Sequence, residues 1–378
     1  MKILVNALSA RMGGIVTYTR DLLASLNERK VGSTFAVSPH FPDQGPGVLR
    51  LAASDLRPFR RFLWEQTVWR AMVKRLAPDV LFSSANFGLF HSPVPQVLLV
   101  SEGGLFDPFY LANCTPEQGP VAGLQRGIRR RLIISSARHS NLVLTPTTTM
   151  RDMLLAWAPD LEGKVEVNSC GTPSNAFTPA QHAPRVWRGD GTLRLLYVSI
   201  YYPHKQPGLV CQAVRSLRAE GIEARATITM GIAETRDFLD GAHDHILLRQ
   251  AEADDLVELG RRRYEDLPGL YHGHDVFVFP SISETFGHPM VEALSSGLPV
   301  VAADTPVNRE VCGDAALYFD PLRPSALVEC IRRLDGDAEL RGRMVRMGRE
   351  RVVQAFTWAS HVDRLIAMFE RVAAGRRP

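Results

Sequence analysis

Short apolar runs rich in β-branched residues alternate along the chain with segments whose apolar residues recur at helical spacing. The segment Ile15–Leu26 is typical of the second kind, because Ile15, Leu22, Leu23 and Leu26 fit one helix. Strands that alternate with helices predict parallel sheets covered on both faces. The predicted strands are Lys2–Asn6, Asp79–Ser83, Gln96–Ser101, Asn141–Pro146, Val165–Asn168, Leu193–Ser199, Ala224–Met230, His245–Leu248, Val276–Phe279 and Val300–Ala303.

One segment breaks this alternation and divides the chain. Residues Thr178–Thr192 contain two prolines and two glycines and show no apolar periodicity, which favours an interdomain linker. We therefore expect an α/β protein with two doubly wound, Rossmann-like domains, 1–177 and 193–358, facing a central cleft. Ligands of such sheets bind beyond the carboxyl ends of the strands, so the cleft is where chemistry is expected.

Composition narrows the class of protein. Of the 378 residues, 45% are hydrophobic and 22% are charged, values that exclude a disordered or fibrous chain. No run approaches 18 apolar residues, and the first ten residues are too short an apolar stretch for a secretory signal. The five cysteines are scattered without a CxxC pair, which argues against structural zinc or a disulfide framework and favours the cytoplasm.

Charge is distributed unevenly between the two halves. Residues 1–176 carry 19 Lys and Arg against 13 Asp and Glu, whereas the rest of the chain is slightly acidic. A basic first half suggests an anionic partner, such as a membrane surface, a phosphorylated acceptor or nucleic acid. No nucleic-acid reader motif accompanies these charges, so nucleic acid is the least favoured of the three.

The segment His274–Asp304 carries the most chemistry. A strand and a loop lead into a helix that Pro289 is expected to open and Gly297 to close. The backbone N–H groups of Met290 and Val291 would then be free to bind an anion such as a diphosphate. Two acids flank this point: Glu284 in the loop, and Glu292 in the predicted first turn. Taken singly, Glu284 could be a solvated loop carboxylate without a function. Glu292 could be an acid that only stabilises the helix through its dipole.

Taken together, the run from Glu284 through Phe286, Gly287, His288 and Pro289 to Glu292 resembles the E-x7-E signature of the retaining glycosyltransferases of family 4, which have the two-domain GT-B fold. The segments Val276–Ser281 and Glu310–Asp314 resemble the flanking parts of that family. Leu195–Lys205 resembles the first strand and loop of its nucleotide-binding domain, where a lysine, here Lys205, meets the donor phosphates. Ile200 stands where many relatives carry an arginine.

The first half resembles the family more weakly. Gly13 and Gly14 precede a predicted helix, which fits either a simple turn or a close backbone approach to a ligand. The resemblance places them beside donor and acceptor. Where many relatives have a His-Asp pair after a strand, this chain reads Ser101-Glu102-Gly103-Gly104. Either Glu102 takes a polar role there, or catalysis relies on substrate phosphate and Glu284. Other candidate cleft histidines, each with a structural alternative, are His91, His139 and His204.

The resemblance implies retaining hexosyl transfer from a UDP- or GDP-type sugar to a hydroxyl of a glycan or lipid-linked acceptor, in cell-surface polysaccharide or glycolipid synthesis. It implies no metal and no cofactor beyond the nucleotide-sugar co-substrate, and a C-terminal helix, 359–378, that completes the first domain. The alternatives are an inactive GT-B subunit that binds an active transferase, and a GT-B epimerase or phosphorylase. The candidate catalytic residues are Glu284, Lys205 and Glu102, and the candidate substrate-binding residues are Gly13, Gly14, Phe286, Gly287, His288, Met290, Val291 and Glu292.

A basic helix is predicted at Leu124–His139. Leu124, Ile128 and Leu132 share one face, with Arg126, Arg129 and Arg130 expected opposite. Such a helix can lie on an anionic membrane at the inner face, or it can be an ordinary surface helix with its charges in water. A second basic stretch comprises Arg57, Arg60, Arg61, Arg70, Lys74 and Arg75.

Overall fold

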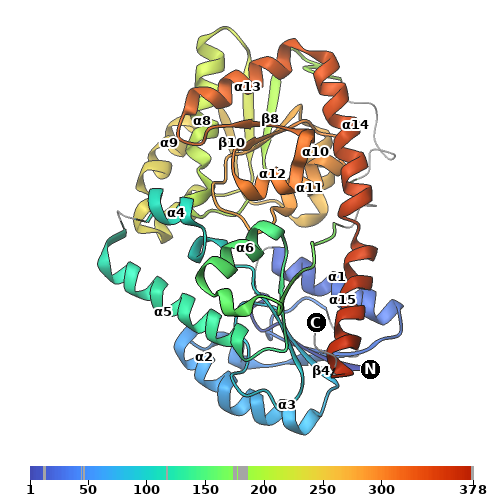
Figure 1. Ribbon diagram of the computed structural model, residues 1–378. Helices are drawn as coiled ribbons and strands as arrows, with labels where there is room; N and C mark the ends of the chain where they lie inside the picture. Colours follow the sequence, from blue (N-terminus) through green and yellow to red (C-terminus); the bar gives the residue numbers. More distant parts are fainter. Residues whose placement is uncertain are drawn as a thin grey trace. The chain divides into compact units, whose positions relative to one another are not determined.

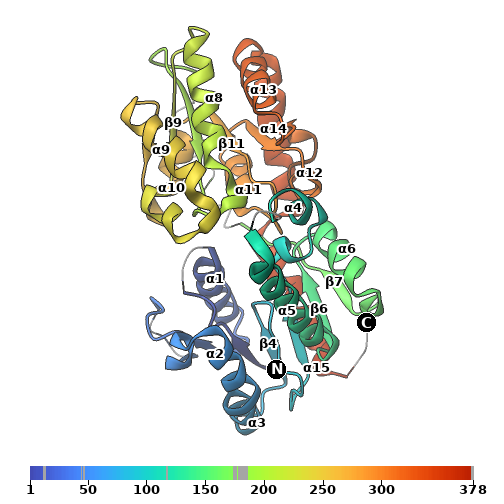
Figure 2. The ribbon, with the colours of Figure 1, turned by 90° about the vertical axis from the view of Figure 1, so that its left-hand side faces the viewer.

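The computed structural model describes residues 1–11, 14–43, 45, 47–115, 118–172, 177 and 186–375. The chain forms two compact units. The first comprises Met1–Phe106, Val121–Ser169 and Ala359–Pro378, and the second comprises Asp107–Pro120 and Cys170–Trp358. In each unit helices cover both faces of a parallel sheet (Figures 1 and 2), which confirms the predicted class of two doubly wound α/β domains.

The first unit contains a seven-stranded sheet in the order β3-β2-β1-β4-β5-β6-β7, with every described pairing parallel. Its strands are β1 (Lys2–Asn6), β2 (Gly32–Val37), β3 (Val48–Arg50), β4 (Val80–Ser83), β5 (Gln96–Leu99), β6 (Leu142–Thr145) and β7 (Val165–Val167). Its helices are α1 (Gly14–Glu28), α2 (Pro58–Trp64), the π-helix η2 (Glu65–Trp69), α3 (Arg70–Leu76), α5 (Gly119–Arg138), α6 (Thr148–Trp157) and α15 (Trp358–Ala373).

Strand β4 shows how this sheet is buried from both sides. Successive side chains of a strand point to opposite faces. Leu81 packs with Trp69 and Val73, whereas the ring of Phe82 lies 5.2 Å from that of Phe369 on α15. Burial on both faces explains why the strand reads as a continuous apolar run. Helix α15 follows the second unit in the chain but packs into the first.

The second unit contains a six-stranded sheet in the order β10-β9-β8-β11-β12-β13. Its strands are β8 (Leu193–Tyr197), β9 (Ala224–Ile228), β10 (Val257–Leu259), β11 (Val276–Phe279), β12 (Val300–Ala303) and β13 (Ala316–Phe319). Its helices are α4 (Pro108–Asn113), α8 (Pro207–Ala219), α9 (Ala242–Ala253), α10 (Leu267–His272), α11 (His288–Ser295), α12 (Pro306–Cys312), α13 (Pro324–Gly336) and α14 (Ala338–Ala355).

Strand order in this sheet reverses between β8 and β11. From β8 the chain moves outward through β9 to β10, and then returns to pair β11 with the other edge of β8. Loops that leave neighbouring strands in opposite directions open a crevice at their carboxyl ends, which is the usual ligand position in such sheets. The loops that follow β8 and β11 therefore define where a site is expected within this unit.

The predicted strand His245–Leu248 is wrong. These residues lie inside helix α9, where Leu248 is buried and Ile246 is 53% exposed. A run as short as Ile-Leu-Leu fits one buried turn of a helix as well as it fits a strand, so periodicity did not separate the two. Strands β2, β3, β10 and β13 were not predicted from the sequence.

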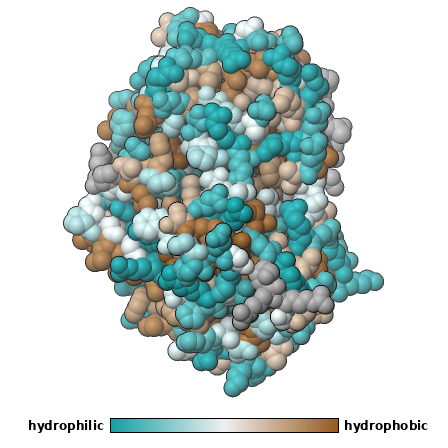
Figure 3. All heavy atoms as spheres, in the orientation of Figure 1, coloured by the Kyte–Doolittle hydropathy of each residue, from teal (hydrophilic) through white to brown (hydrophobic). Residues whose placement is uncertain are grey.

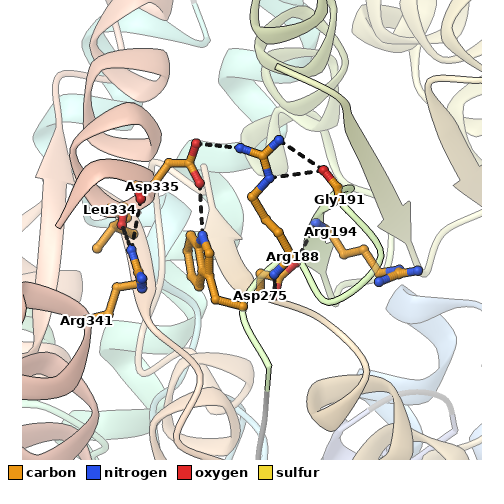
Figure 4. Close-up of polar contacts among 8 residues, drawn as sticks. Arg188, Gly191, Arg194, Asp275, Leu334, Asp335 and Arg341 are labelled. Atoms are coloured by element: carbon orange, nitrogen blue, oxygen red, sulfur yellow. Dashed lines mark hydrogen bonds and ion pairs between the residues drawn. The ribbon is translucent and has the colours of Figure 1, made fainter. Parts of the chain in front are cut away.

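The second half of the predicted linker is fixed to the second unit. Trp187 and Arg188 each donate a hydrogen bond of 2.9 Å to the carboxylate of Asp335 on α13. The carboxylate of Asp275 accepts hydrogen bonds from the backbone N–H groups of Arg188 and Arg194, at 3.1 and 2.8 Å (Figure 4). Residues 186–192 are thus held by hydrogen bonds to the second unit directly before β8. Residues 178–185 lie outside the described residues.

Two further placements differ from the sequence prediction. The segment Asp107–Pro120, expected within the first domain, belongs to the second unit. On α5, Arg129 and Arg130 do not form a free basic face. Arg129 pairs with Glu102 at 2.6 Å, and the guanidinium of Arg130 lies 3.4 Å from the ring centroid of Trp157. Among the described residues no helix is both long and apolar enough to cross a bilayer.

Candidate functional site

Lys205 and Glu284 meet at the reversal of strand order in the second sheet. Lys205 ends a short 3₁₀ turn (Pro203–Lys205) after β8, and Glu284 lies in the loop after β11. Their side chains form an ion pair, and only 13% and 11% of the two side chains remain exposed. Residues 79 positions apart in the chain thus place a cation and a carboxylate at the carboxyl ends of adjacent strands.

The loop that carries Lys205 is held on several sides. The hydroxyl of Tyr197 donates a 2.8 Å hydrogen bond to the Lys205 carbonyl, and the N–H of Ile282 donates one of 3.1 Å to the His204 carbonyl. The Lys205 ammonium also lies 5.7 Å from the ring centroid of Phe279, within reach of a cation–π contact. A backbone hydrogen bond therefore joins the β8 and β11 loops next to the ion pair.

This arrangement can bind an anion. The ammonium of Lys205 is a compact charge suited to phosphate oxygens, and Glu284 supplies acceptors for hydroxyl groups. An anionic ligand that reaches Lys205 would compete with Glu284 for the ammonium. Within the described residues, no group of three or more His, Cys, Asp and Glu side chains is arranged to hold a metal ion.

Gly287 starts helix α11 in a conformation that favours glycine. Its φ is +82°, and an added Cβ would lie 2.5 Å from the Cε atom of Met290. The prediction of free N–H groups at this helix start is wrong for Met290, whose N–H donates to the Gly287 carbonyl at 3.0 Å. The side chains of Met290 and Val291 are buried in the core of the unit. Phe286 is also buried, with its ring centroid 5.3 Å from that of Phe356.

Glu292 lies in the second turn of α11, not in the first as predicted, and it is buried. The hydroxyl of Tyr271 donates to one carboxylate oxygen at 2.8 Å, and the hydroxyl of Tyr264 lies 3.5 Å from the other. Burial raises the pKa of Glu292 to about 7, although both tyrosines oppose this shift. A carboxyl tuned in this way can accept or donate hydrogen bonds near neutral pH.

Two histidines flank these segments. His288 begins α11 with its ring 5.0 Å from that of Phe286, and burial lowers its pKa to about 4. His204 precedes Lys205, and burial, aided by the Lys205 charge, lowers its pKa to about 3. The His204 ring stacks on Tyr202 at 5.6 Å and meets Tyr110 of α4 edge-on at 5.7 Å. Both imidazoles are therefore neutral at physiological pH.

Sequence reasoning missed Asp107. It is buried, and its carboxylate accepts from the N–H groups of Phe109 and Tyr110 as the N-cap of α4. Burial raises the pKa of Asp107, and the neighbouring Ser283 side chain partly opposes that rise. Ser283 directly precedes Glu284, so α4 adds a second acid next to the β11 loop. The Asp-Pro pair signals a helix start, but nothing local in the sequence indicates contact with Ser283.

The remaining candidates lie in the first unit. Glu102 pairs with Arg129, and Gly14 is the exposed first residue of α1, while Gly13 lies outside the described residues. The rings of His91 and His139 lie 5.4 Å apart and contact each other edge-on. Glu102, Gly14, His91 and His139 all lie in the first unit. Their proposed contacts with a substrate remain predictions.

Part of this chain is similar in sequence to known glycosyltransferases. Residues 184–351 match the family model described as glycosyl transferases group 1. O-antigen chain mannosyltransferase B of Escherichia coli is 31% identical over 150 residues, which cover 40% of this chain and 38% of that protein. Mannosylfructose-phosphate synthase of Agrobacterium fabrum is 35% identical over 108 residues, 28% of this chain and 24% of that protein. The matches thus span well under half of these relatives.

Solved structures resemble the whole chain. Sucrose-phosphate synthase from Thermosynechococcus elongatus superposes with a TM-score of 0.79 at 18% identity, covering 99% of this chain and all of that one. Anabaena HepE in complex with UDP-glucose gives 0.73 at 17% identity, covering 98% and 99%. At such identities the likeness shows the fold, which is the two-domain α/β fold of GT-B glycosyltransferases.

Proposed function

We propose that this protein is a retaining glycosyltransferase of family 4, which transfers a sugar from a nucleoside-diphosphate donor to a hydroxyl of a glycan or lipid-linked acceptor. The observation that carries the proposal is the Lys205–Glu284 pair at the strand-order reversal of the second sheet, inside the segment that matches glycosyl transferases group 1. The reaction belongs to cell-surface polysaccharide synthesis, in keeping with a relative named for the O-antigen chain.

The roles follow from the charge that develops during transfer. As the glycosidic bond breaks, the leaving diphosphate gains negative charge, and Lys205 stabilises that charge without a metal ion. Glu284, released from Lys205 by the donor phosphates, accepts hydrogen bonds from the sugar hydroxyls. A phosphate oxygen takes the proton of the acceptor hydroxyl on the face that the phosphate leaves, so the anomeric configuration is retained.

Glu292 has a different role in this proposal. Its buried carboxyl accepts hydrogen bonds from the ribose hydroxyls, after giving up the 3.5 Å contact with Tyr264. The 2.8 Å hydrogen bond from Tyr271 holds the carboxyl in place meanwhile. Glu292 therefore acts on nucleotide binding, and Glu284 acts on the reacting sugar.

Mannose is the sugar we propose for the donor, because the relative O-antigen chain mannosyltransferase B and the serotype-specific mannosyltransferase WbdA of E. coli are both named for it. UDP-glucose is the first competitor to exclude, because it is bound in the solved HepE structure. The experiment is a thermal-shift panel of GDP-mannose, UDP-glucose, UDP and GDP, followed by donor hydrolysis or transfer to an E. coli glycolipid extract.

The expected result is the largest shift with GDP-mannose, since binding to the folded state stabilises by mass action. Lys205→Gln should abolish that shift, whereas Lys74→Gln, a change at an exposed lysine in the first unit, should preserve it. A shift of equal size in the Lys205→Gln variant would contradict the phosphate role. A larger thermal shift with UDP-glucose than with GDP-mannose would overturn mannose as the donor sugar. The proposal that the protein is a glycosyltransferase would stand.

One observation favours a second candidate, an inactive subunit that binds a transferase partner. The chain lacks the family's His-Asp pair after β5, and Glu102 is held in an ion pair with Arg129. Turnover of the cognate donor by the purified chain would exclude this candidate. Donor binding without turnover, in the presence of an acceptor that an active relative uses, would favour it.

A further inference from the structure

One segment of the chain leaves the first unit and then returns to it. The chain up to Phe106 and the chain from Val121 belong to the first unit, whereas Asp107–Pro120, which carries α4, belongs to the second (Figure 1). Phe106 itself is buried in the core of the first unit. We call Asp107–Pro120 the α4 strap, because it packs on the second unit and is continuous at both ends with the first.

The α4 strap contacts the loop after β8 through Tyr110. The Tyr110 ring meets the ring of His204 edge-on, with 5.7 Å between their centroids. Tyr202 stacks on the same imidazole at 5.6 Å, so His204 contacts two aromatic rings. His204 directly precedes Lys205, and α4 therefore supports this loop one residue before the ammonium group.

The α4 strap contacts the loop after β11 through Asp107. The Asp107 carboxylate is buried and accepts hydrogen bonds from the N–H groups of Phe109 and Tyr110, at 2.9 and 3.3 Å, which hold it at the start of α4. The same carboxylate lies beside the side chain of Ser283, which is also buried. Ser283 directly precedes Glu284, so α4 supports this second loop one residue before the Glu284 carboxylate.

The far end of the α4 strap has its own anchor. The side-chain amide of Gln118 donates a 2.7 Å hydrogen bond to the carboxylate of Asp240. Phe238, two residues before Asp240, lies with its ring centroid 5.4 Å from that of Tyr202, and Tyr202 in turn stacks on His204. The strap is therefore attached to the second unit at both ends.

We propose that Asp107 and Tyr110 are positioning residues for the sugar transfer, an inference that rests on the proposed function. Asp107 orients the loop after β11, and with it the Glu284 carboxylate. Tyr110 orients the loop after β8, and with it the Lys205 ammonium. Neither side chain touches the substrate. A displacement of about 1 Å at a reacting group costs up to about a hundredfold in rate, so supports one residue away from both groups affect the reaction.

The two residues should give different kinetic signatures. Asp107→Ala should lower turnover of GDP-mannose about tenfold or more and leave GDP affinity, measured by calorimetry, within about twofold of the parent, because Glu284 acts on the sugar. Tyr110→Ala should weaken GDP affinity about tenfold, because the lysine that binds the diphosphate loses an aromatic support. If UDP gives a larger thermal shift than GDP, UDP and UDP-glucose take the place of GDP and GDP-mannose.

Conservative variants and a double variant separate positioning from a general loss of structure. Asp107→Asn keeps the N-cap and Tyr110→Phe keeps the ring, so both should stay within about threefold of the parent in turnover and GDP affinity. Because Asp107 acts through Glu284, adding Asp107→Ala to Glu284→Gln should cause no further loss of turnover.

Two control variants change exposed side chains. Asn113→Ala removes a 2.8 Å hydrogen bond to the Phe109 carbonyl within α4 itself. Glu339→Gln changes a side chain that is 84% exposed on α14, whose outer side is mostly hydrophilic in Figure 3. Both controls should keep the turnover and the GDP affinity of the parent. Thermal midpoints are recorded for every variant, because Asp107→Ala also loses the N-cap of α4.

Three results would overturn the proposal. One is that Asp107→Ala and Tyr110→Ala match Asn113→Ala in both turnover and GDP affinity. Another is a parallel loss of both properties in both variants that follows the thermal midpoint, since α4 would then only stabilise the fold. The third is a further loss of about tenfold when Asp107→Ala is added to Glu284→Gln, since Asp107 would then act independently of Glu284.

Failure of the proposed function would look different. A parent protein that binds GDP but does not turn over any donor would contradict the transferase, and the GDP affinities would still test the strap. A loss of affinity in Tyr110→Ala, with Tyr110→Phe and Asp107→Ala unaffected, would support the positioning roles in that case. Equal affinities in all three variants would count against them.

Discussion

Replacing Glu292 with glutamine should stabilise the protein at high pH and have almost no such effect at low pH. The Glu292 carboxyl is buried, and that burial raises its pKa from 4.5 to about 7. An acid with a raised pKa favours folding in its protonated form. The folded state therefore loses stability as pH rises from about 4.5 to about 7, and above pH 7 the full penalty remains. Glutamine keeps the shape of the side chain and cannot ionise.

The expected magnitude follows from the two pKa values. A rise from 4.5 to about 7, at about 1.4 kcal/mol for each tenfold change in proton affinity, amounts to about 3 kcal/mol. The free energy of unfolding of Glu292→Gln minus that of the parent should therefore be about 3 kcal/mol more positive at pH 8 than at pH 4. With an m-value of about 2–3 kcal/mol per molar, the urea midpoint moves by about 1 M.

The assay is urea unfolding of both proteins at pH 4, 6 and 8, followed by circular dichroism and tryptophan fluorescence. Glu339→Gln serves as the control, because the Glu339 side chain is 84% exposed on α14 and should give no such pH trend. A stability difference that does not change with pH would refute the burial argument. So would a Glu292→Gln protein that is less stable than the parent at pH 8.

Three further predictions concern the site and the core. Glu284→Gln should leave affinity for the bare nucleotide, measured by calorimetry, nearly unchanged. Turnover of the full donor, measured by saturation kinetics, should fall about a hundredfold, since a charge-assisted contact in the transition state contributes about 3 kcal/mol. Turnover equal to that of the parent would refute the role of Glu284. Phe369→Ala should lower the free energy of unfolding by about 3–5 kcal/mol, because its ring is buried against Phe82, and an unchanged denaturation midpoint would contradict that packing. Gly287→Ala should lower stability by about 1–2 kcal/mol, since φ is +82° there, and Gly287→Asn should cost less in the same melting experiment.

The sequence predicted the fold class well because buried parallel strands leave a strong pattern. Val276–Phe279 and Val300–Ala303 are continuous apolar runs, and both are strands at these bounds. The prediction failed at His245–Leu248, where the same kind of run is part of a helix. It also failed at β13, Ala316–Phe319, because this run is as long as the other two but contains no β-branched residue, so it lacks the composition typical of a strand.

The candidate site was predicted in part. The residue types and spacing drew attention to Lys205, Glu284 and Glu292, but their partners come from elsewhere in the fold. Tyr271 reaches Glu292 from α10, and the Lys205–Glu284 pair depends on the order of strands in the sheet. No local pattern in the sequence encodes those contacts. The functional roles of the three residues remain predictions until the variants are measured.

The position of α15 has a consequence for how the protein is made on the ribosome. Phe82 lies on β4 of the first unit, and its ring partner Phe369 is translated 287 residues later, after the whole second unit. At about 5–20 residues per second, the nascent first unit waits roughly 15–60 s with one face of β4 uncovered. Chaperones that bind exposed apolar strands should therefore crosslink to the nascent chain at Phe82 throughout synthesis, and release it only once α15 has left the exit tunnel.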